Sequence, residues 1–404
     1  MRNTFAKQLS LTSALVFSSP LYISVFLMRF SFGLVLFTIP IYLPRREFSN
    51  FVVGMVAAAY PVAETIFGPF VGVLADRYGR RRWVYVGLAI STVALSAFTL
   101  SRQFSYLLVV HAIQGIAASM VVVSSLTMVT DISSVSTRGR EMGIYDFANL
   151  GGYVLGIFSA GVLLRTGNMT APFYFGSALA ALGAIFAYFK LKATRPSTGS
   201  ILSPLKTIRL LLGDRRAAAM FPIWLSVTTF IGMALTFGPR EGPSPVITSA
   251  LLGGVILVLA FTQPFFGHLS DKYGRERLMM LGMLSLVGLF VSVILMLRGR
   301  LSFDYALPFL VAFGVGSFAF APAALATLGD FAPRTGRGTT MGMYSVVISL
   351  GTIIGPLLGG YLLDRYGISS LFYAGLMIII LALALAIIIT GPSFRALQPL
   401  HTNS

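Results

Sequence analysis

The sequence contains no cysteine and few charged residues. Without cysteine the chain forms no disulfide, carries out no thiolate chemistry and has no cysteine-ligated metal site. Charged residues make up 11% of the sequence, against about 25% in a typical soluble domain. So few charges do not keep the surface of a 404-residue protein in water, and 56% of the residues are apolar. The composition therefore favours a chain whose solvent is lipid.

Long apolar runs are the most frequent feature of the sequence. A helix that crosses the hydrocarbon core of a bilayer needs about 20 predominantly apolar residues. Twelve runs meet this requirement, and we predict transmembrane helices over 20–43, 51–74, 83–101, 104–130, 142–164, 171–190, 219–238, 246–269, 278–297, 305–328, 341–363 and 369–391. The first run is longer than the core of about 7–15 residues in a signal peptide, so we interpret it as a membrane helix too. The predicted fold class is an all-α polytopic membrane protein.

Acidic residues are scarce, at 13 against 30 Lys and Arg, which gives a formal net charge of +17. A strongly basic chain can bind nucleic acid through its phosphates. Here, however, most Lys and Arg residues fall in alternate loops, on the side of the membrane that carries the N-terminus. This is the positive-inside pattern. We therefore expect both termini to be cytoplasmic, the location to be the cell membrane, and no nucleic acid to bind.

The longest polar break covers residues 191–218. Leu and Ile residues recur in it at helical spacing between Lys and Arg residues. This pattern is typical of a basic amphipathic helix on the cytoplasmic face of a membrane. The break divides the spans six and six, so we predict an N-terminal six-helix bundle over 1–190, a linker over 191–218 and a C-terminal bundle over 219–404.

The two halves repeat one pattern. The segment GVLADRYGRRR at 72–82 matches GHLSDKYGRER at 267–277. Further along, Asp131, Arg138, Gly139, Met142, Gly143, Tyr145, Gly152, Gly156 and Gly161 match identical residues at 330, 337, 338, 341, 342, 344, 351, 355 and 360. The matches keep their register through polar loops, which indicates a tandem duplication of six helices. Six-helix repeats with a site between them are a transporter architecture.

The doubled loop, in a chain of twelve spans, resembles the signature loop of the major facilitator superfamily of secondary transporters. The resemblance covers essentially the whole chain and implies two pseudo-symmetric six-helix bundles that work by alternating access. In that family these loops latch the halves together on the cytoplasmic side. The resemblance implies that the latch, or gating, residues are Gly72, Asp76, Arg77, Gly79, Arg80, Asp131 and Arg138, with Asp271, Gly274, Arg275 and Asp330 in the second copy. Arg81 and Arg82 are explained as well by topology alone.

The sequence departs from the family pattern in two places. Many members carry Arg three residues before a Gln-Gly pair in the fourth span, whereas this chain has His111 before Gln114 and Gly115. Exporters often carry Gly-Pro-x-x-Gly-Gly in the fifth span, but here the proline is missing from 156–161, and the full form occurs at 355–360 instead. These departures weaken any direct transfer of a proton-coupling or antiport role.

Four ionisable residues lie well inside the predicted spans: Arg29, Glu64, His111 and Asp146. Such residues are costly at membrane depth and mark functional sites by default. The positions that match the last three in the second half hold Leu259, Leu310 and Ser345. The scaffold is therefore built without these charges, which makes a purely structural role less favoured. The four lie in spans that, by resemblance, line the first half's side of the central cavity.

These residues suggest a coupling mechanism. Burial in a low-dielectric cavity favours a protonated carboxyl group, whereas a neighbouring arginine favours the carboxylate. Alternating access changes both effects, so an acid can take up a proton on one side and release it on the other. We predict Asp146 and Glu64 as proton carriers, with Asp146 slightly favoured. Arg29 and His111 would orient the acids or bind an anionic substrate, and Gln114, Asn149 and Tyr60, three or four residues away on the same helix faces, complete the predicted substrate site.

The sequence has no Walker-type loop, no nucleophile–base motif and no cluster with metal-ligand spacing, so we expect no ATP drive, no enzyme activity, no metal and no cofactor. The leading hypothesis is a monomeric proton-coupled carrier that exports an amphipathic or drug-like compound. Alternatives are an organic-anion or metabolite symporter, a uniporter if the acids are structural, or a membrane sensor on the same scaffold.

Overall fold

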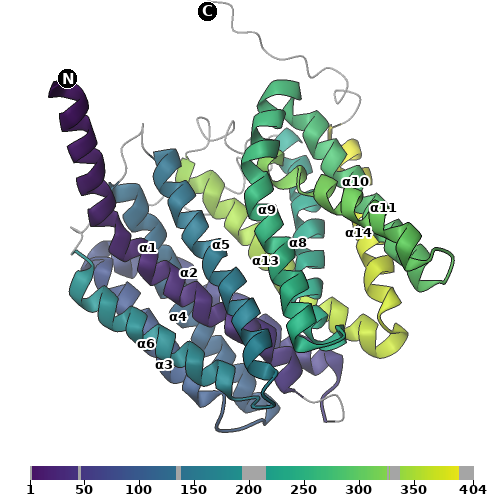
Figure 1. The fold of residues 1–404 in the computed structure, drawn as a ribbon, viewed down its shortest axis with the longest axis horizontal. Helices are drawn as coiled ribbons and strands as arrows, with labels where there is room; N and C mark the ends of the chain where they lie inside the picture. Colours follow the sequence, from purple (N-terminus) through teal and green to yellow (C-terminus); the bar gives the residue numbers. More distant parts are fainter. Residues whose placement is uncertain are drawn as a thin grey trace, which may run out of the picture. The chain divides into compact units, whose positions relative to one another are not determined.

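The structure is a computed structural model that describes residues 2–43, 47–132, 138–192, 215–324, 327 and 337–390. Side chains are described from Pro20 onward, and not for residues 130, 132, 138–140, 215–217, 337–345 and 390. The described residues form α-helices (Figure 1): α1 Arg2–Tyr42, α2 Asn50–Tyr78, α3 Arg81–Ala97, α4 Phe104–Ile132, α5 Arg138–Leu164, α6 Ala171–Lys190, α8 Arg215–Glu241, α9 Pro245–Tyr273, α10 Arg275–Leu297, α11 Phe303–Ser317, α13 Arg337–Tyr366 and α14 Ser369–Thr390. The predicted all-α class is confirmed.

Eleven segments of the described residues are long and apolar enough to cross a membrane. α14 is the most apolar, with a mean hydropathy of 2.9, and it exposes Leu381, Leu385 and Ile388. A helix that is apolar on all sides belongs in lipid or in a protein core. The remaining predicted span, 83–101, corresponds to α3, which has only 17 residues. Backbone hydrogen bonds close turns at Phe98, Thr99 and Leu100 and end this helix before the predicted boundary.

The chain divides into two compact units. The first comprises Met1–Gly199, Ala234–Ala260 and Pro356–Gly360, and the second comprises Ser200–Met233, Phe261–Gly355 and Tyr361–Ser404. The predicted division into two six-helix halves stays a prediction. The predicted amphipathic linker lies largely outside the described residues, which resume at Arg215 in α8.

In the first unit, α1 packs against α5 and α6, α2 packs against α4, and α3 packs between α4 and α6. Small residues bring α1 and α5 together. A Cβ atom on Gly33 would lie 2.7 Å from the carbonyl oxygen of Tyr153, and one on Gly152 would lie 2.6 Å from that of Phe26. A Cβ atom on Gly156 would meet the carbonyl oxygen of Phe30. Since lipid supplies no hydrophobic force between helices, close packing of this kind is what holds them together.

We expect Gly156→Val to destabilise the first unit by about 1–3 kcal/mol or more, because the new side chain meets the backbone of α1 and α1 has no room to yield. The apparent melting temperature of the purified protein measures the effect. Gly143→Val on the same helix is the matched control, since a Cβ atom there has nothing within 4 Å. Equal melting temperatures for the two variants would contradict the assignment of close packing to Gly156.

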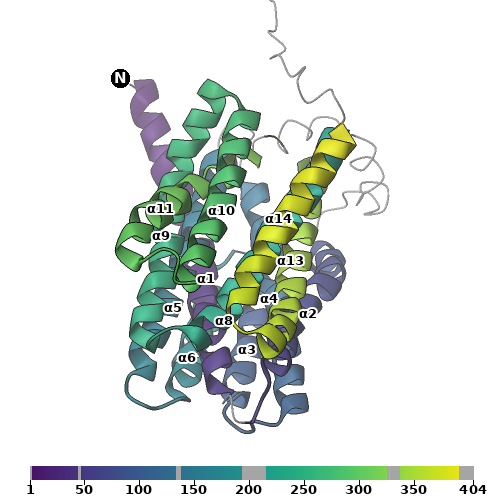
Figure 2. The same ribbon diagram turned by 90° about the vertical axis from the view of Figure 1, so that its right-hand side faces the viewer.

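In the second unit, α10 packs against α11 and α14, as Figures 1 and 2 both show. Its core includes the buried side chains of Trp224, Phe290, Phe320 and Ile379. The rings of Trp224 and Phe320 meet edge to face with centroids 5.0 Å apart. Such aromatic pairs add to packing beyond the area they bury.

Candidate functional site

Arg29 is a buried charged residue of the first unit. It lies on α1 with 9% of its surface exposed. Its Nη1 donates a hydrogen bond of 2.9 Å to the hydroxyl of Tyr153 on α5, and its guanidinium carbon lies 5.1 Å from the centre of that ring. The hydrogen bond and the ring face both stabilise a guanidinium that lacks water. The close α1–α5 contact at the glycines positions this pair.

Aromatic rings connect Arg29 to the helices around it. Phe32, one turn after Arg29 on α1, stacks on Tyr60 of α2 with centroids 4.2 Å apart and meets Tyr153 edge to face at 5.5 Å. Tyr60 in turn lies 5.5 Å from the ring of His111 on α4. The structure therefore brings predicted residues of α1, α2 and α4 into one cluster. Phe32 and Tyr153 were not predicted, although Tyr153 follows Asn149 by four residues and so shares its helix face.

Glu64 belongs to the same cluster. It is half-buried on α2, one turn after Tyr60. It interacts electrostatically with Arg29 and with Tyr60 and Tyr153. A carboxylate near a buried guanidinium offsets part of the free energy needed to bury both charges. Arg29 and Glu64 therefore interact as an acid–base pair of this cluster through space, without an ion pair that joins their atoms directly.

Asp146 lies apart from that pair. It is exposed on α5 and interacts electrostatically with its neighbour Tyr145. Two predicted proton carriers thus occupy different surroundings, one beside a buried cation and one on an exposed helix face. The sequence placed both acids inside predicted spans, but it did not distinguish these surroundings.

Several buried polar atoms of the cluster have no hydrogen-bond partner among the residues that the structure describes. His111 uses Nδ1 in a 2.7 Å contact with the carbonyl oxygen of Val56, which leaves its Nε2 unpartnered. The other unpartnered atoms of the predicted substrate site are Nε of Arg29, Oη of Tyr60, Oε1 of Gln114 and Oδ1 of Asn149. A buried donor or acceptor without a partner costs about 1–3 kcal/mol. These atoms are suited to bind the polar groups of a solute or of water.

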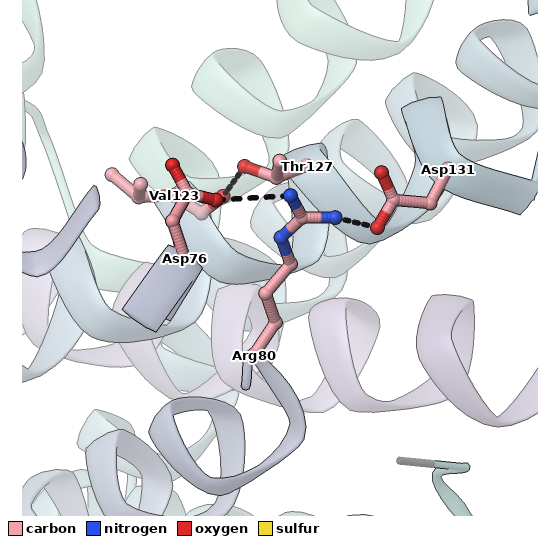
Figure 3. A network of polar contacts seen from close by, with 5 residues as sticks. All are labelled: Asp76, Arg80, Val123, Thr127 and Asp131. Atoms are coloured by element: carbon pink, nitrogen blue, oxygen red, sulfur yellow. Dashed lines mark hydrogen bonds and ion pairs between the residues drawn. The ribbon is translucent and has the colours of Figure 1, made fainter. Parts of the chain in front are cut away.

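The α2–α3 loop makes a second polar network (Figure 3). Gly79 ends α2 with a φ of +85°, a conformation that glycine adopts readily, and the chain then places Arg80 beside Asp76 and Asp131. Nη2 of Arg80 lies 2.9 Å from Oδ1 of Asp76, and Nη1 pairs with Asp131 at the end of α4. The Arg80 side chain is 5% exposed. Thr127, drawn next to it, donates to the carbonyl oxygen of Val123 at 2.6 Å.

The remaining predicted gating residues differ in their contacts. Arg77 is exposed and lies over the ring of Tyr78, 5.3 Å from its centre, so it does not join Asp76 and Asp131. Gly72 faces Val123 of α4. The side chain of Arg138 and the whole of Asp330 lie outside the described residues.

The second copy of the loop has the same backbone but a looser ion pair. Gly274 has a φ of +97°, as its sequence match to Gly79 predicts. Arg275, however, lies 3.8 Å from Asp271, whose side chain is 68% exposed. The repeat that is nearly symmetric in sequence is therefore asymmetric in its electrostatics.

Sequence reasoning missed the buried carboxylate of Glu141. It is 6% exposed in the first turn of α5, and it accepts a hydrogen bond from the hydroxyl of Tyr22 on α1. The predicted span began at 142 and so excluded it. A signal was present, because Glu141 is followed by the repeated Met142 and Gly143, while the matching position of the second half holds the uncharged Thr340.

Comparison with known proteins agrees with this architecture. The sequence model of the Major Facilitator Superfamily matches residues 21–242 and, a second time, residues 218–401. Multidrug resistance protein 2 of Bacillus subtilis (strain 168) is 25% identical over 377 residues, which cover 88% of this chain and 91% of the relative. Quinolone resistance protein NorA of Staphylococcus aureus (strain COL) is 26% identical over 359 residues, which cover 85% of this chain and 89% of the relative.

Solved structures show the same fold. The structure of a variant of the nucleoside transporter NupG aligns with a TM-score of 0.70 at 16% identity, covering 93% of this chain and 99% of that chain. A bacterial homologue of the human lysosomal transporter Spinster aligns with a TM-score of 0.70 at 14% identity, covering 94% of each chain. The family match extends over nearly the whole sequence, and the helices are those of a polytopic membrane protein. The chain therefore belongs to the Major Facilitator Superfamily and is a membrane transporter rather than an enzyme.

Proposed function

We propose that this chain exports amphipathic, drug-like compounds across the cell membrane in exchange for protons. The observation that carries the proposal is the buried Arg29 among aromatic rings, inside membrane-spanning helices and within electrostatic reach of Glu64. An acid in such a place binds a proton or a cationic solute, but not both at once, which couples their fluxes. The names of the relatives, which speak of multidrug and quinolone resistance, support the choice of substrate class.

The proposed roles follow the geometry. Glu64 is the principal proton carrier, and Asp146 is a second one that meets the substrate or the aqueous phase. Arg29 attracts the carboxylate of Glu64 and so competes for it with a proton or a cationic substrate. Tyr60, His111, Gln114 and Asn149 contact the substrate through rings and unpartnered polar atoms.

The latch and the topology complete the proposal. The network of Asp76, Arg80 and Asp131 steadies one end of the first unit while access alternates. That end is cytoplasmic, as are both termini, because the basic loops lie there. The working unit is a monomer with two six-helix halves, one over 1–190 and the other over 219–404.

A thermal-shift screen of the purified protein tests the substrate class. We expect a lipophilic cation or a quinolone to raise the apparent melting temperature. At a ligand concentration one hundred times Kd, binding adds about 2.7 kcal/mol to the free energy of unfolding. The effect of the cation should be larger at pH 8 than at pH 5.5, because the carboxyl group that binds it must first release its proton. Glu64→Gln should remove this pH dependence. Stabilisation by neutral sugars alone would contradict the proposal.

An organic-anion carrier is the second candidate. Arg29 carries a buried guanidinium nitrogen, Nε, without a partner among the described residues, and such a nitrogen binds an anion as a donor. His111 donates from Nδ1 to the carbonyl oxygen of Val56, so its Nε2 donates to an anion only when the ring is protonated. Stabilisation by an organic anion that disappears in Arg29→Ala would favour this function over cation export.

A further inference from the structure

An apolar groove runs along the outer face of the first unit between α3 and α4. Its volume is about 490 Å³, and its lining is apolar throughout, with Tyr85, Ala89, Val93 and Ala97 on α3 and Val110 and Ile113 on α4. The groove is open at its side, where Val93 is 70% exposed. From Tyr85 to Ala97 the helix rises about 18 Å. The hydrocarbon core of a bilayer is about 30 Å thick, and each leaflet supplies half of it. The groove is therefore about as long as one extended acyl chain.

The sequence explains why the groove exists. α3 and α4 touch at Gly87, where a Cβ atom would lie 2.6 Å from the carbonyl oxygen of Ala117 and 2.9 Å from Cβ of Met120. Toward the other end of α3 the lining residues facing α4 are small, including Ala94 and Ala97. Small side chains leave a space there that neither helix fills. Since the chain spans a membrane, this space faces acyl chains rather than water.

Basic and aromatic side chains gather where the groove begins, at the start of α3 and the end of α6. Arg81 and Arg82 lie one turn before Tyr85 and Val86, on the same helix face. Arg82 is exposed, and its guanidinium carbon lies 4.7 Å from the ring centre of Tyr78. Arg81 donates to the carbonyl oxygen of Tyr188, whose ring meets Tyr85 edge to face at 5.3 Å.

Two donors at this end need an acceptor. Nε of Arg81 and the indole Nε1 of Trp83 are buried and have no hydrogen-bond partner within the described part of the chain. The neighbouring carboxylates of Asp76 and Asp131 pair with Arg80 instead. The positive charges of Arg81 and Arg82 are therefore available to an external anion. These two atoms are enclosed by the protein, whereas the exposed guanidinium of Arg82 is open to a phosphate, which supplies the missing negative charge.

We propose that this surface binds one anionic phospholipid. Its phosphate lies at Arg82 and Arg81, near the ring of Trp83, which is 6.0 Å from the guanidinium carbon of Arg82, and one acyl chain lies in the α3–α4 groove. Basic clusters next to membrane helices recognise anionic head groups, and tyrosine and tryptophan rings favour the interface where head group and acyl chain meet. The groove distinguishes this site from simple attraction of lipid to a charged loop, because binding at this site needs the acyl chain of the lipid as well as its head group.

Tryptophan fluorescence tests the proposal directly, because the chain has only two tryptophans. In full-length Trp224→Phe, Trp83 is the only reporter. The protein is reconstituted in phosphatidylcholine vesicles that contain an equal mole fraction of either brominated phosphatidylglycerol or brominated phosphatidylcholine. We expect the anionic lipid to quench Trp83 more effectively, with a preference of about fivefold or more. Equal quenching by the two lipids would overturn the proposal.

Three variants separate the parts of the site. Arg82→Gln is expected to reduce the preference about fivefold, since each basic residue at the surface contributes about that factor. Ala89→Phe, which fills the exposed groove, should also reduce it, whereas Arg165→Gln, an exposed arginine beyond the far end of α5, should not. Loss of the preference on addition of inorganic phosphate, with no effect of Ala89→Phe, would show a head-group site without an acyl groove. Native mass spectrometry of the unaltered chain, with both lipids present, provides the same preference without any tryptophan substitution.

Discussion

Glu64→Gln is expected to abolish proton-driven accumulation of substrate. The amide keeps the shape of the side chain, but it neither binds nor releases a proton. In vesicles with a pH difference of one unit and the membrane potential clamped at zero, one exchanged proton sustains about a tenfold substrate ratio, since one pH unit is about 1.4 kcal/mol. The variant should equilibrate the substrate to a ratio of one. A fluorescent quinolone or a lipophilic cationic dye reports the ratio.

The control for this prediction is Asp146→Asn. Asp146 is exposed on α5 and interacts with Tyr145, whereas Glu64 interacts with the buried Arg29. We therefore expect Asp146→Asn to lower the ratio without abolishing it. Downhill movement of the substrate through Glu64→Gln shows that the variant is folded. If Glu64→Gln kept the full tenfold substrate ratio and Asp146→Asn reached a ratio of only one, the assignment of the principal proton carrier would be reversed.

Arg80→Gln is expected to be the most destabilising change in the signature loops. It leaves two neighbouring carboxylates, Asp76 and Asp131, without their shared cation. Removing one partner of a buried pair costs about 3–5 kcal/mol. Because 38% of the Asp131 side chain is exposed, we expect a smaller loss, about 1.5–3 kcal/mol, as for hydrogen bonds to charged groups. The apparent melting temperature should fall by about 3–10 °C for a unit of this size.

The duplicated loop offers a matched control in Arg275→Gln. Arg275 occupies the same position in the second copy, but its contact with Asp271 is 3.8 Å long, and that carboxylate is mostly exposed. Exposed pairs contribute about 0–1 kcal/mol, so the melting temperature should change little. If both variants lose the same stability, the asymmetry of the two loops has no energetic consequence.

The asymmetry suggests how the two copies of the repeat have diverged in role. Glu64, His111 and Asp146 lie in the first half, and their matches in the second half are uncharged. The tight network of Arg80 lies in the first half as well. In the proposed mechanism, the first unit therefore provides both the proton-binding group and the firmer latch.

The helices of this protein could be predicted from the sequence because the requirement is local. A bilayer leaves no water to satisfy backbone groups, so each long apolar run has to be a helix, wherever its neighbours lie. The run at 369–391 needed no tertiary information to be assigned, and α14 covers Ser369–Thr390. Two helices end well before their predicted boundaries, α3 at Ala97 and α11 at Ser317, because turn hydrogen bonds at Phe98 and Phe318 decide where they stop. The two copies of the doubled loop agree in backbone as well as in sequence, since Gly79 and Gly274 both have a positive φ.

Only the tertiary structure decided which charges meet. The sequence placed Arg29, Glu64, His111 and Asp146 at membrane depth, but the hydrogen bond of Arg29 to Tyr153 and its electrostatic interaction with Glu64 depend on how α1, α2 and α5 are rotated about their axes. That rotation is set by contacts between residues far apart in the chain, such as Gly33 with Gly156. The buried pair of Tyr22 and Glu141 joins positions 119 residues apart, and no local pattern predicts it. Hydropathy is a property of each segment by itself, whereas a binding site is a property of the packing between segments.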